Sequence, residues 1–530
     1  MKFFNTTGAI QPDMHYCIPP LERLNTEEIL QLIAAQRYFV LHAPRQTGKT
    51  SCLLALTDLL NQSGRYRAVY ANIEPAQAAR ENVEMGIHIV LGAIASQAQY
   101  LLRDDLPYQR MKPVLEQFGG GQALYQLLHE WSLSNPLPLA LMLDEVDTLV
   151  GDTLISLLRQ LRSGYQNRPQ AFPQSIILCG VRDVRDYRIH SASTKEIITG
   201  GSAFNIKAES LRLGNFTPEE VERLYRQHTA ETGQVFDDDV FPLVWELTAG
   251  QPWLVNALAH QATWNMKEMR DRAKPITVEV IQQAKEELIL RRDTHLDQLY
   301  DKLTEERVRR VIEPLLAGGE LDANTDLSNE IQYVIDLGLV ARGARGLKIS
   351  NAIYREVIPR ELTAVTQLNL ESTTRQPAWY VLPDGRLDMR KLLAEFQQFF
   401  RENSEHWVER FDYKEAGPQL LLQAFLHRVV NGGGRLEREY GLGRKRTDLL
   451  VIWPYPGGVQ RIVLELKIGS ANSPALLSRG LEQTAEYMDK CGAPEGHLVC
   501  FDRGAGKSWD EKLFTRAETF QTHTIQVWGM

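Results

Sequence analysis

The chain has 530 residues, 43% of them hydrophobic and 24% charged, and it carries a net charge of −8. This composition excludes extensively disordered and fibrous proteins, and the length predicts about three or four domains. The acidic balance excludes a protein that is basic overall, although a local basic patch is enough to bind nucleic-acid phosphates.

Residues 1–290 alternate short apolar runs with helical patterns, which indicates a parallel β-sheet covered by helices, an α/β fold. From Thr217 onward this segment is all helical. Thr217 is a plausible N-cap, Pro218 takes the first helical position and Glu220 completes a capping box. The expected strands lie at 38–43, 68–73, 139–144 and 175–180.

A loop typical of phosphate binding follows the first of these strands and precedes a helical pattern over 51–60. In this context backbone N–H groups and the helix N-terminus point at a phosphate. Lys49 supplies a positive charge for the β- and γ-phosphates, and the Thr50 hydroxyl can bind Mg²⁺. Ala43 replaces the first glycine of the usual pattern and disfavours a positive φ, which leaves the loop geometry open. The expected nucleotide-binding residues of the loop are Ala43, Pro44, Arg45, Gln46, Thr47, Gly48, Lys49, Thr50 and Ser51.

Two further strand ends carry polar residues that suit phosphate chemistry. The apolar strand 139–143 ends in Asp144, which can hold the magnesium ion, and Glu145, which can orient the attacking water. The strand 175–179 runs into Arg182 and Arg185. Arg182 is the preferred sensor of the γ-phosphate and Arg185 the alternate, while surface ion pairs with neighbouring aspartates are an equally weighted interpretation. The loop and the acidic strand end together predict ATP and Mg²⁺ as cofactors.

These motifs resemble a known group of ATPases. Asp144–Asp147 and the lid run Gly250–Val255 look like those of AAA-like and signal-transduction (STAND-type) ATPases. The stretches 15–24 and 38–50 look like the bacterial AAA-like domain family. In such relatives a Gly-x-Pro motif, matched here by Gly250 and Pro252, packs on the adenine, and a winged helix often follows. The resemblance covers roughly residues 1–360 and implies ATP binding with a nucleotide-dependent conformational switch.

Residues 295–362 carry helical patterns at 302–316 and 327–338, followed by two short strand-like runs joined by a turn at Gly343–Gly346. Helices followed by a small β-hairpin indicate a winged helix, with a helical linker as the alternative. Residues 363–385 are polar and rich in turn residues, which predicts a linker.

A last domain is expected over 386–530, where a hairpin brings Asp448 near Glu465. Glu465 and Lys467 share one face of their strand because side chains alternate along it. Two carboxylates suit Mg²⁺ or Mn²⁺, and Lys467 can stabilise negative charge that develops on phosphate. The expected helices lie at 386–401, 416–431 and 475–490, and the expected strands at 447–453, 459–468 and 496–501.

The pattern Asp448 followed by Glu465-Leu466-Lys467 resembles the PD-(D/E)XK nuclease superfamily. Gln483 and Tyr487, four residues apart on one helix face, look like the RecB-type branch. The resemblance implies Mg²⁺-dependent cleavage of nucleic acid, most often DNA. It carries over Asp448, Glu465 and Lys467 as catalytic, and Gln483 and Tyr487 as supporting residues. The competing interpretation is a solvent-facing Glu465–Lys467 pair.

Many relatives add an acidic residue upstream. Glu415 and Glu439 are both candidates, and the sequence does not decide between them. The segment 428–446 carries six Lys or Arg residues against two Glu, which would concentrate phosphates beside Asp448. A solvated basic loop is the alternative.

Five cysteines without zinc spacing fit reduced thiols. Cys52 and Cys179 are expected in the core, as are Trp253 and Trp264. No run approaches the length of about 18 apolar residues that a membrane span needs, and the N-terminus has no apolar signal core. We therefore expect no membrane span and a cytoplasmic protein.

The sequence predicts an ATP-regulated, metal-dependent nuclease that hydrolyses phosphodiester bonds, with DNA as its expected partner. A role in defence against foreign DNA rests on analogy with the domain combination alone. The alternative is an ATP-dependent nucleic-acid-binding regulator or scaffold that does not cut, and a DNA-repair enzyme is a third hypothesis. DNA against RNA, the trigger, the direction of ATP control and a homo-oligomeric state stay open.

Overall fold

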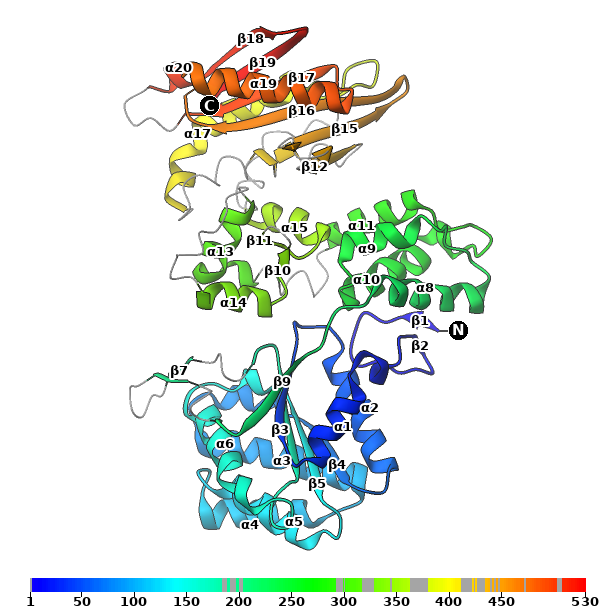
Figure 1. Ribbon diagram of the computed structural model, residues 1–530, viewed down its shortest axis with the longest axis vertical. Coiled ribbons are helices and arrows are strands. Elements are labelled where there is room, and N and C mark those ends of the chain that lie inside the picture. The colour runs from blue at the N-terminus through cyan, green and yellow to red at the C-terminus, as the bar shows by residue number, and fades with distance from the viewer. Residues whose placement is uncertain are drawn as a thin grey trace. The chain divides into compact units, whose positions relative to one another are not determined.

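The chain divides into two compact units, one comprising Met1–His295 with Gln332–Val340 and the other Leu296–Ile331 with Ala341–Met530 (Figure 1). The computed structural model describes residues 2–183, 188–190, 197–199, 204–291, 299, 301–316, 328–343, 346–362, 380–410, 422–423, 425–426, 434–438, 441–442, 445–446, 449–470, 473–502 and 508–530.

The first unit is built on a five-stranded parallel sheet with the strand order β4-β5-β6-β3-β9. The four strands predicted from apolar runs are all present, and β9 at the sheet edge was not predicted. β6 lies between β3, which leads into the phosphate-binding loop, and β5, which ends in Asp144. The strands are β3 (Tyr38–His42), β4 (Arg67–Asn72), β5 (Leu139–Asp144), β6 (Ser175–Gly180) and β9 (Lys207–Arg212), and a separate hairpin pairs β7 (Arg188–His190) with β8 (Ile197–Thr199).

Helices cover both faces of this sheet, which explains why apolar side chains of its central strands point to both faces (Figure 1). On β3, Tyr38 and Val40 pack with helices α3, α5 and α6, while Phe39 and Leu41 pack with α1 and α2 on the opposite face. Cys52 and Cys179 lie in the second of these cores, as predicted. The helices are α1 (Thr26–Ala34), α2 (Lys49–Gln62), α3 (Val83–Leu102), α4 (Leu106–Phe118), α5 (Ala123–Ser134) and α6 (Gly151–Ser163), with the 3₁₀ turns η1 (Pro20–Arg23), η2 (Glu74–Ala79), η3 (Val146–Thr148) and η4 (Gly164–Asn167).

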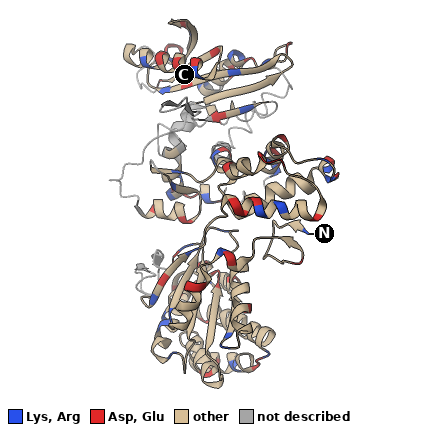
Figure 2. Cartoon of the chain, turned by 45° about the vertical axis from the view of Figure 1, so that its right-hand side comes forward, with Lys and Arg blue, Asp and Glu red and all other residues tan. Residues whose placement is uncertain are grey.

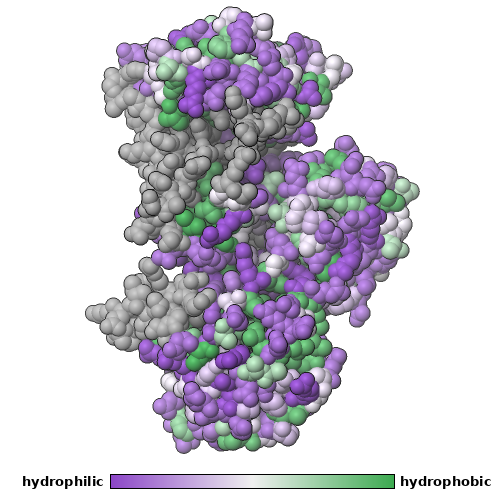
Figure 3. All heavy atoms as spheres, in the orientation of Figure 1, coloured by the Kyte–Doolittle hydropathy of each residue, from purple (hydrophilic) through white to green (hydrophobic). Residues whose placement is uncertain are grey.

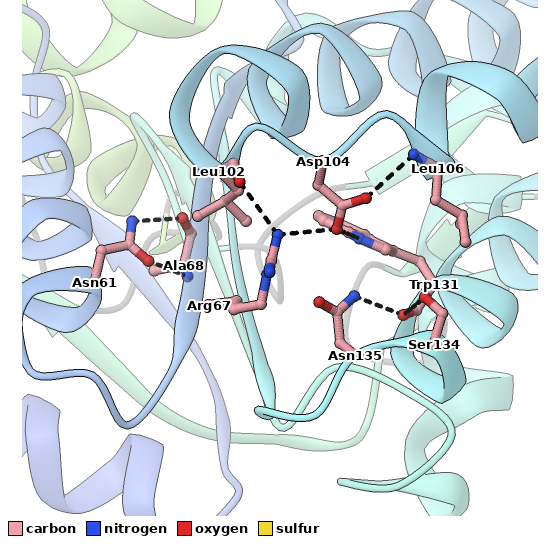
Figure 4. A network of polar contacts seen from close by, with 9 residues as sticks. All are labelled: Asn61, Arg67, Ala68, Leu102, Asp104, Leu106, Trp131, Ser134 and Asn135. Carbon is pink, nitrogen blue, oxygen red and sulfur yellow. Dashed lines mark hydrogen bonds and ion pairs between the residues drawn. The ribbon is translucent and has the colours of Figure 1, made fainter.

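A polar network fixes the junction of α3 and α4 to the sheet (Figure 4). Asp104, in the turn between the two helices, accepts hydrogen bonds from Arg67 of β4 at 3.0 Å and from the indole of Trp131 of α5 at 2.9 Å. Its other oxygen accepts the Leu106 N–H at 3.1 Å. One carboxylate therefore ties a strand and three helices together.

The helical part of this unit begins with the predicted capping box: the Thr217 hydroxyl accepts from the Glu220 N–H, and Glu220 accepts from the Thr217 N–H. Pro218 is the first residue of α8, as predicted. The N-terminal strands β1 and β2 lie beside this lid, with Phe4 against Tyr225 at 5.4 Å between ring centroids. The lid comprises α8 (Pro218–Thr232), α9 (Val240–Thr248), α10 (Pro252–His260), the π-helical turn η6 (Gln261–Asn265), η7 (Lys267–Arg270) and α11 (Val278–Arg291), and the N-terminal strands are β1 (Phe3–Phe4) and β2 (His15–Tyr16).

The segment predicted to form a winged helix contains the expected order of helices followed by a two-stranded hairpin. Its elements are α13 (Glu306–Leu316), α14 (Ser328–Asp336), β10 (Val340–Gly343), β11 (Gly346–Ile349) and α15 (Ala352–Leu362). The order of elements agrees with the prediction, whereas the winged-helix assignment itself stays a prediction. Most of the predicted linker, 363–379, lies outside the described residues, and Gly385 near its end accepts a hydrogen bond from the indole of Trp453 at 2.9 Å.

The second unit contains a six-stranded mixed sheet with the order β12-β15-β16-β17-β19-β18. The predicted hairpin is β15–β16, and the predicted crossover helix α19 joins β16 to the parallel strand β17. Strands β18 and β19 were not predicted, and the expected helix 416–431 lies outside the described residues except for 422–423 and 425–426. The elements are α17 (Met389–Arg410), β12 (Arg435–Arg438), β13 (Gly441–Leu442), β14 (Lys445–Arg446), β15 (Leu449–Tyr455), β16 (Gly458–Ile468), α19 (Pro474–Cys491), β17 (Glu495–Phe501), α20 (Trp509–Lys512), β18 (Phe514–Phe520) and β19 (His523–Gly529).

The visible surface of the first unit mixes hydrophilic and hydrophobic side chains (Figure 3). One described helix, α3, is long and apolar enough by composition to cross a membrane. Its Ile87, Val90 and Leu91 are instead buried in the core beside β4, where a helix of an α/β unit is expected to be apolar.

Candidate functional site

The phosphate-binding loop joins β3 to α2 without straining its first residue. Ala43, buried below the loop, is not among the residues with positive φ. That conformation falls on Gln46 at 57° and on Gly48 at 94°. Alanine can therefore replace the usual glycine at position 43, because the residues with positive φ lie further along the loop. Thr47 closes the turn with a 2.8 Å hydrogen bond from its hydroxyl to the Pro44 carbonyl.

Lys49 lies folded back over the loop. Its ammonium donates to the carbonyls of Ala43 and Pro44, both at 3.0 Å, and the residue is 6% exposed. Its hydrogen bonds to described residues go to two neutral carbonyls, and a buried ammonium so bound gains much from a phosphate nearby. The position, at the first turn of α2, is the one from which a lysine meets a phosphate bound at the helix N-terminus.

Asp144 and Thr50 meet directly, although they lie on different elements. The Thr50 hydroxyl donates to Asp144 at 2.7 Å, and the Tyr70 hydroxyl donates to the same carboxylate oxygen at 3.0 Å. Asp144 is fully buried at the end of β5. A hydroxyl and a carboxylate supply only oxygen donors, which is the donor set that Mg²⁺ prefers. These two residues therefore fit the predicted magnesium site.

Glu145 follows in a left-handed backbone conformation, with φ of 61°, which turns the chain sharply out of β5. Burial raises the pKa of its carboxyl above the ordinary value, against the opposing pull of the Lys49 ammonium. A raised pKa suits a carboxylate that must take up a proton near neutral pH. The backbone turn and the partial burial thus agree with the predicted role in orienting water.

Arg182 follows β6, between the phosphate-binding loop and Asp144 in the strand order, as a sensor residue requires. Its guanidinium contacts Asp336 at 3.5 Å and lies 4.9 Å from the centroid of the Tyr333 ring. Of the two aspartates in the surface-pairing interpretation, Asp183 contacts Lys207 at 2.6 Å, and Asp186 lies outside the described residues. The alternate, Arg185, lies outside the described residues.

The lid reaches the loop through the Gly-x-Pro motif. Gly250 has a φ of 70°, and the Phe216 N–H donates to its carbonyl at 2.8 Å. A Cβ atom at this position would lie 2.1 Å from the Phe216 carbonyl oxygen, so only glycine fits. Pro252 then starts α10 with a φ suited to the first helical turn.

An open pocket in the first unit is lined by the phosphate-binding loop, the lid and the N-terminal segment. Arg23 closes part of it: its guanidinium donates to the carbonyls of Thr47 and Gly214 and lies over the Phe216 ring. The pocket is lined by Asn5, Thr6, Thr7, Gly8, Ile10, Tyr16, Cys17, Ile18, Pro20, Arg23, Gln46, Gly48, Ser51, Cys52, Phe216, Leu224, Pro252, Trp253 and Asn256.

The two tryptophans expected in the core differ. Trp253 is buried, lines the pocket and donates to the Thr6 carbonyl at 2.9 Å. Trp264 is 48% exposed, with the Arg270 guanidinium 4.9 Å from its ring centroid, so its assignment to the core was wrong. The π-helical turn that carries Trp264 changes which residues face inward, and helical periodicity does not reveal such a turn.

In the second unit, the described part of the β15–β16 hairpin begins at Leu449, directly after Asp448. Leu449 pairs with Leu464 and Leu450 with Val463. Leu449 follows Asp448 in the chain, and Leu464 precedes Glu465. Asp448 itself lies outside the described residues, as do the alternative acidic residues Glu415 and Glu439.

Glu465 is not the solvent-facing residue of the competing interpretation, because it is 2% exposed. The Lys467 ammonium contacts its carboxylate at 2.5 Å on the same strand face. Burying a carboxylate is costly unless it is paired or binds a cation. The described residues contain no cluster of three or more His, Cys, Asp or Glu side chains able to hold a metal ion.

Helix α19 covers the sheet face that carries Glu465, because Tyr487 and Val463 pack in the same core. The Gln483 side-chain oxygen, one helical turn before Tyr487, is buried and accepts no hydrogen bond from a described residue. On the described elements of this unit, basic residues are interspersed with acidic ones (Figure 2). Most of the predicted basic segment lies outside the described residues, and within it Arg435 pairs with Glu437 at 3.1 Å.

Sequence reasoning missed three residues at the first site: Tyr70, Arg23 and Asn256. Each is brought there by long-range packing. Arg23 lies in the stretch 15–24 that resembles the AAA-like family but was given no role, and Tyr70 carried a signal as a hydroxyl within an otherwise apolar strand that pairs with β5.

No family model matches this sequence, and no curated protein matches it. Among solved structures, the Walker-type ATPase of Pyrococcus abyssi is similar at 12% identity and a TM-score of 0.46, covering 67% of this chain and 99% of that one. Cdc6p from Pyrobaculum aerophilum is similar at 15% identity and 0.36, covering 68% and 97%. A variant of RuvB from Thermotoga maritima is similar at 13% identity and 0.34, covering 64% and 94%. At TM-scores this low, the nucleotide site rests on the geometry of this chain.

Proposed function

We propose that the first unit binds and hydrolyses ATP. The observation that carries this proposal is the meeting of Thr50 and Asp144, 2.7 Å apart, beside the buried Lys49 ammonium. Three residues from two strand ends converge where the N-terminus of α2 favours a phosphate.

In this proposal Lys49 exchanges its two carbonyl partners for phosphate oxygens. Glu145 orients the attacking water and accepts its proton, and Arg182 leaves Asp336 to bind the terminal phosphate. Thr50 and Asp144 hold Mg²⁺, which when bound offsets the negative charge of the phosphates.

The test is phosphate release and nucleotide binding by Lys49→Ala in the full chain. We expect binding and turnover to fall by at least about 100-fold, because the variant removes the cation that faces the phosphates. Lys112→Ala is the matched control, since Lys112 is exposed on α4 and pairs only with Glu116 at 3.7 Å. Turnover at the wild-type rate in Lys49→Ala would refute the proposal.

We also propose that the second unit is a metal-dependent nuclease acting on DNA, controlled by the nucleotide state of the first. The supporting observation is the buried Glu465–Lys467 pair on a central strand, whose hairpin register leads toward Asp448. Asp448 and Glu465 would hold Mg²⁺ or Mn²⁺, which supplies an activated water when bound. Lys467 would stabilise the charge on the phosphate, with Gln483 and Tyr487 in support.

Cleavage of supercoiled plasmid, single-stranded DNA and RNA, in Mg²⁺ or Mn²⁺ and with or without ATP, tests this second proposal. We expect cutting of DNA that is lost in Asp448→Ala and kept in Glu482→Ala, an exposed acidic residue on α19. Nucleic-acid binding without cutting in any nucleotide state would instead identify a regulator or scaffold.

A further inference from the structure

The pocket beside the phosphate-binding loop has two chemically different ends. Gln46, Gly48 and Ser51 line the end at the loop, where phosphates bind in the proposed function. Pro252 and Asn256, one turn apart on α10, line the end at the lid. A nucleotide held by its phosphates therefore places its base toward α10.

Most polar side chains of this pocket already have partners. Arg23 donates to two carbonyls, the Ser51 hydroxyl accepts the Ile10 N–H at 2.9 Å, and the Asn5 amide bonds to Gly8 and Thr7. Two side chains differ. The buried Tyr16 hydroxyl has no hydrogen-bond partner among the described residues, although the Glu231 carboxylate lies near it, and Asn256 is only 6% exposed. Its Oδ1 is buried and accepts no hydrogen bond from any residue that the structure describes.

The orientation of the Asn256 amide is fixed by chemistry. Nδ2 donates to the Pro252 carbonyl at 2.8 Å. If the amide were flipped, Oδ1 would lie against the Pro252 carbonyl oxygen, and two acceptors cannot form a hydrogen bond. Oδ1 is therefore the atom left over, and an unpaired buried acceptor costs free energy until a donor reaches it. Gln251 also has an unpaired side-chain atom, but that atom is a donor and the residue does not line the pocket.

We propose that Asn256 reads the base of the bound nucleotide, with Oδ1 accepting a hydrogen bond from the exocyclic amine of adenine. This inference rests on the proposed nucleotide site and adds its selectivity. Adenine presents an amino donor at C6, whereas guanine presents a carbonyl acceptor there. Oδ1 accepts a hydrogen bond from the amino group of adenine, whereas the carbonyl oxygen of guanine is another acceptor and repels it. Asn256 therefore favours adenine nucleotides over guanine nucleotides.

The test combines a change in the ligand with a change in the protein. Titration calorimetry of the full chain with Mg²⁺ measures the affinity for ADP, for purine riboside diphosphate, which lacks only the amine, and for GDP. Wild-type protein is expected to bind ADP about 10-fold more tightly than purine riboside diphosphate. Asn256→Leu, similar in size but without an acceptor, is expected to bind both alike and to discriminate less against GDP.

Asn265→Leu is the matched control, since Asn265 lies on the lid outside the pocket and donates to Gln261 at 2.8 Å. It should keep the wild-type preference. Equal affinities of the wild type for ADP and purine riboside diphosphate would overturn the inference. This comparison uses the wild-type protein alone, so it does not depend on whether a variant folds. If the wild type binds none of the three nucleotides, the proposed nucleotide site itself fails.

Discussion

Asp144 shows how single residues define the first site. One of its carboxylate oxygens accepts from both Thr50 and Tyr70, which positions it before any cation binds. Hydrogen bonds from the Thr50 and Tyr70 hydroxyls, on α2 and β4, thus offset the free energy needed to bury this carboxylate. Tyr70 is a positioning residue: it acts on the proposed magnesium site only through Asp144.

The protonation of Glu145 gives the first prediction. Because burial raises its pKa, turnover of ATP should fall as pH decreases through a value above that of an ordinary glutamate. A pH profile of kcat/KM, which reports the pKa values of the free enzyme, measures this limb. The folded protein also holds this proton more tightly than the unfolded chain, so this residue lowers stability as pH rises through that pKa.

Glu145→Gln removes the group that accepts the proton and also the loss of stability with rising pH. The variant should therefore lose turnover, keep ADP binding and be no less stable than the wild type at neutral pH. A wild-type profile whose acid limb lies at the pKa of an exposed glutamate would contradict the assignment, as would a glutamine variant with wild-type turnover.

At this scale the sequence predicts the residues of the local motif well. The order of residues from Ala43 to Ser51 and the acidic end of β5 carry enough information, because a phosphate-binding loop is continuous in the chain. Asn256 and Arg23 could not be predicted, since the lid and the N-terminal segment bring them to the pocket from distant positions.

At the scale of elements, strands that carry a continuous apolar run were predictable, the edge strand β4 included, whereas strands with a weaker pattern were not. β9 reads Lys-Ala-Glu-Ser-Leu-Arg and is mostly exposed or half-buried, so it lacks the apolar run that marks β3 or β5. β18 alternates half-buried and exposed residues at the edge of the second sheet. Such alternation is short and weak beside the continuous apolar pattern of a central parallel strand.

The entry to α10 gives a prediction with a matched control. Gly250→Ala and Gly233→Ala both force alanine into a left-handed conformation, with φ values of 70° and 77°. A Cβ atom at Gly233 meets nothing within 4 Å, whereas one at Gly250 collides with the Phe216 carbonyl. We expect Gly233→Ala to cost about 1 kcal/mol and to leave ADP affinity unchanged. Gly250→Ala should weaken ADP binding at least about 10-fold, and equal affinities in the two variants would contradict the role of this contact.

The network around Asp104 gives a prediction about stability (Figure 4). Asp104→Ala leaves Arg67 and the Trp131 indole without their shared acceptor, which should cost about 2 kcal/mol. Hydrogen exchange of β4 and α5 measures this locally, as a chain of several domains does not unfold in two states. Asp105→Ala is the control, since Asp105 is exposed and its carboxylate accepts a hydrogen bond from the exposed side chain of Gln99 at 2.8 Å. ATP turnover should not change in either variant, and equal protection of β4 in both would refute the stabilising role.

At the scale of the whole molecule, one short segment of the first unit lies, in the chain, between two parts of the second. Gln332–Val340 belongs to the first unit, although the chain before and after it belongs to the second. Within the first unit this segment contacts the nucleotide site at two points: Asp336 pairs with Arg182, and Gly338 lies so close to Pro44 that a Cβ atom there would approach its ring to 2.7 Å.

The last prediction concerns the pair of Arg182 and Asp336. In the proposed mechanism Arg182 leaves a buried carboxylate before it reaches the terminal phosphate, so the pair would oppose hydrolysis. Asp336→Asn keeps the shape and the hydrogen bond from Gln332 but removes the charge. We expect it to raise the rate of phosphate release by about 10-fold, the size of a typical coupling between sites.

The double variant that combines Asp336→Asn with Arg182→Ala tests whether the increase in the rate of phosphate release depends on Arg182. If Arg182 binds the terminal phosphate, the double variant must hydrolyse ATP no faster than Arg182→Ala alone, because the released group is absent. A double variant as fast as Asp336→Asn would show that the segment controls hydrolysis by another contact. In the nuclease assay, a change in cutting by Asp336→Asn that Arg182→Ala abolishes would connect the two proposed activities through this one segment.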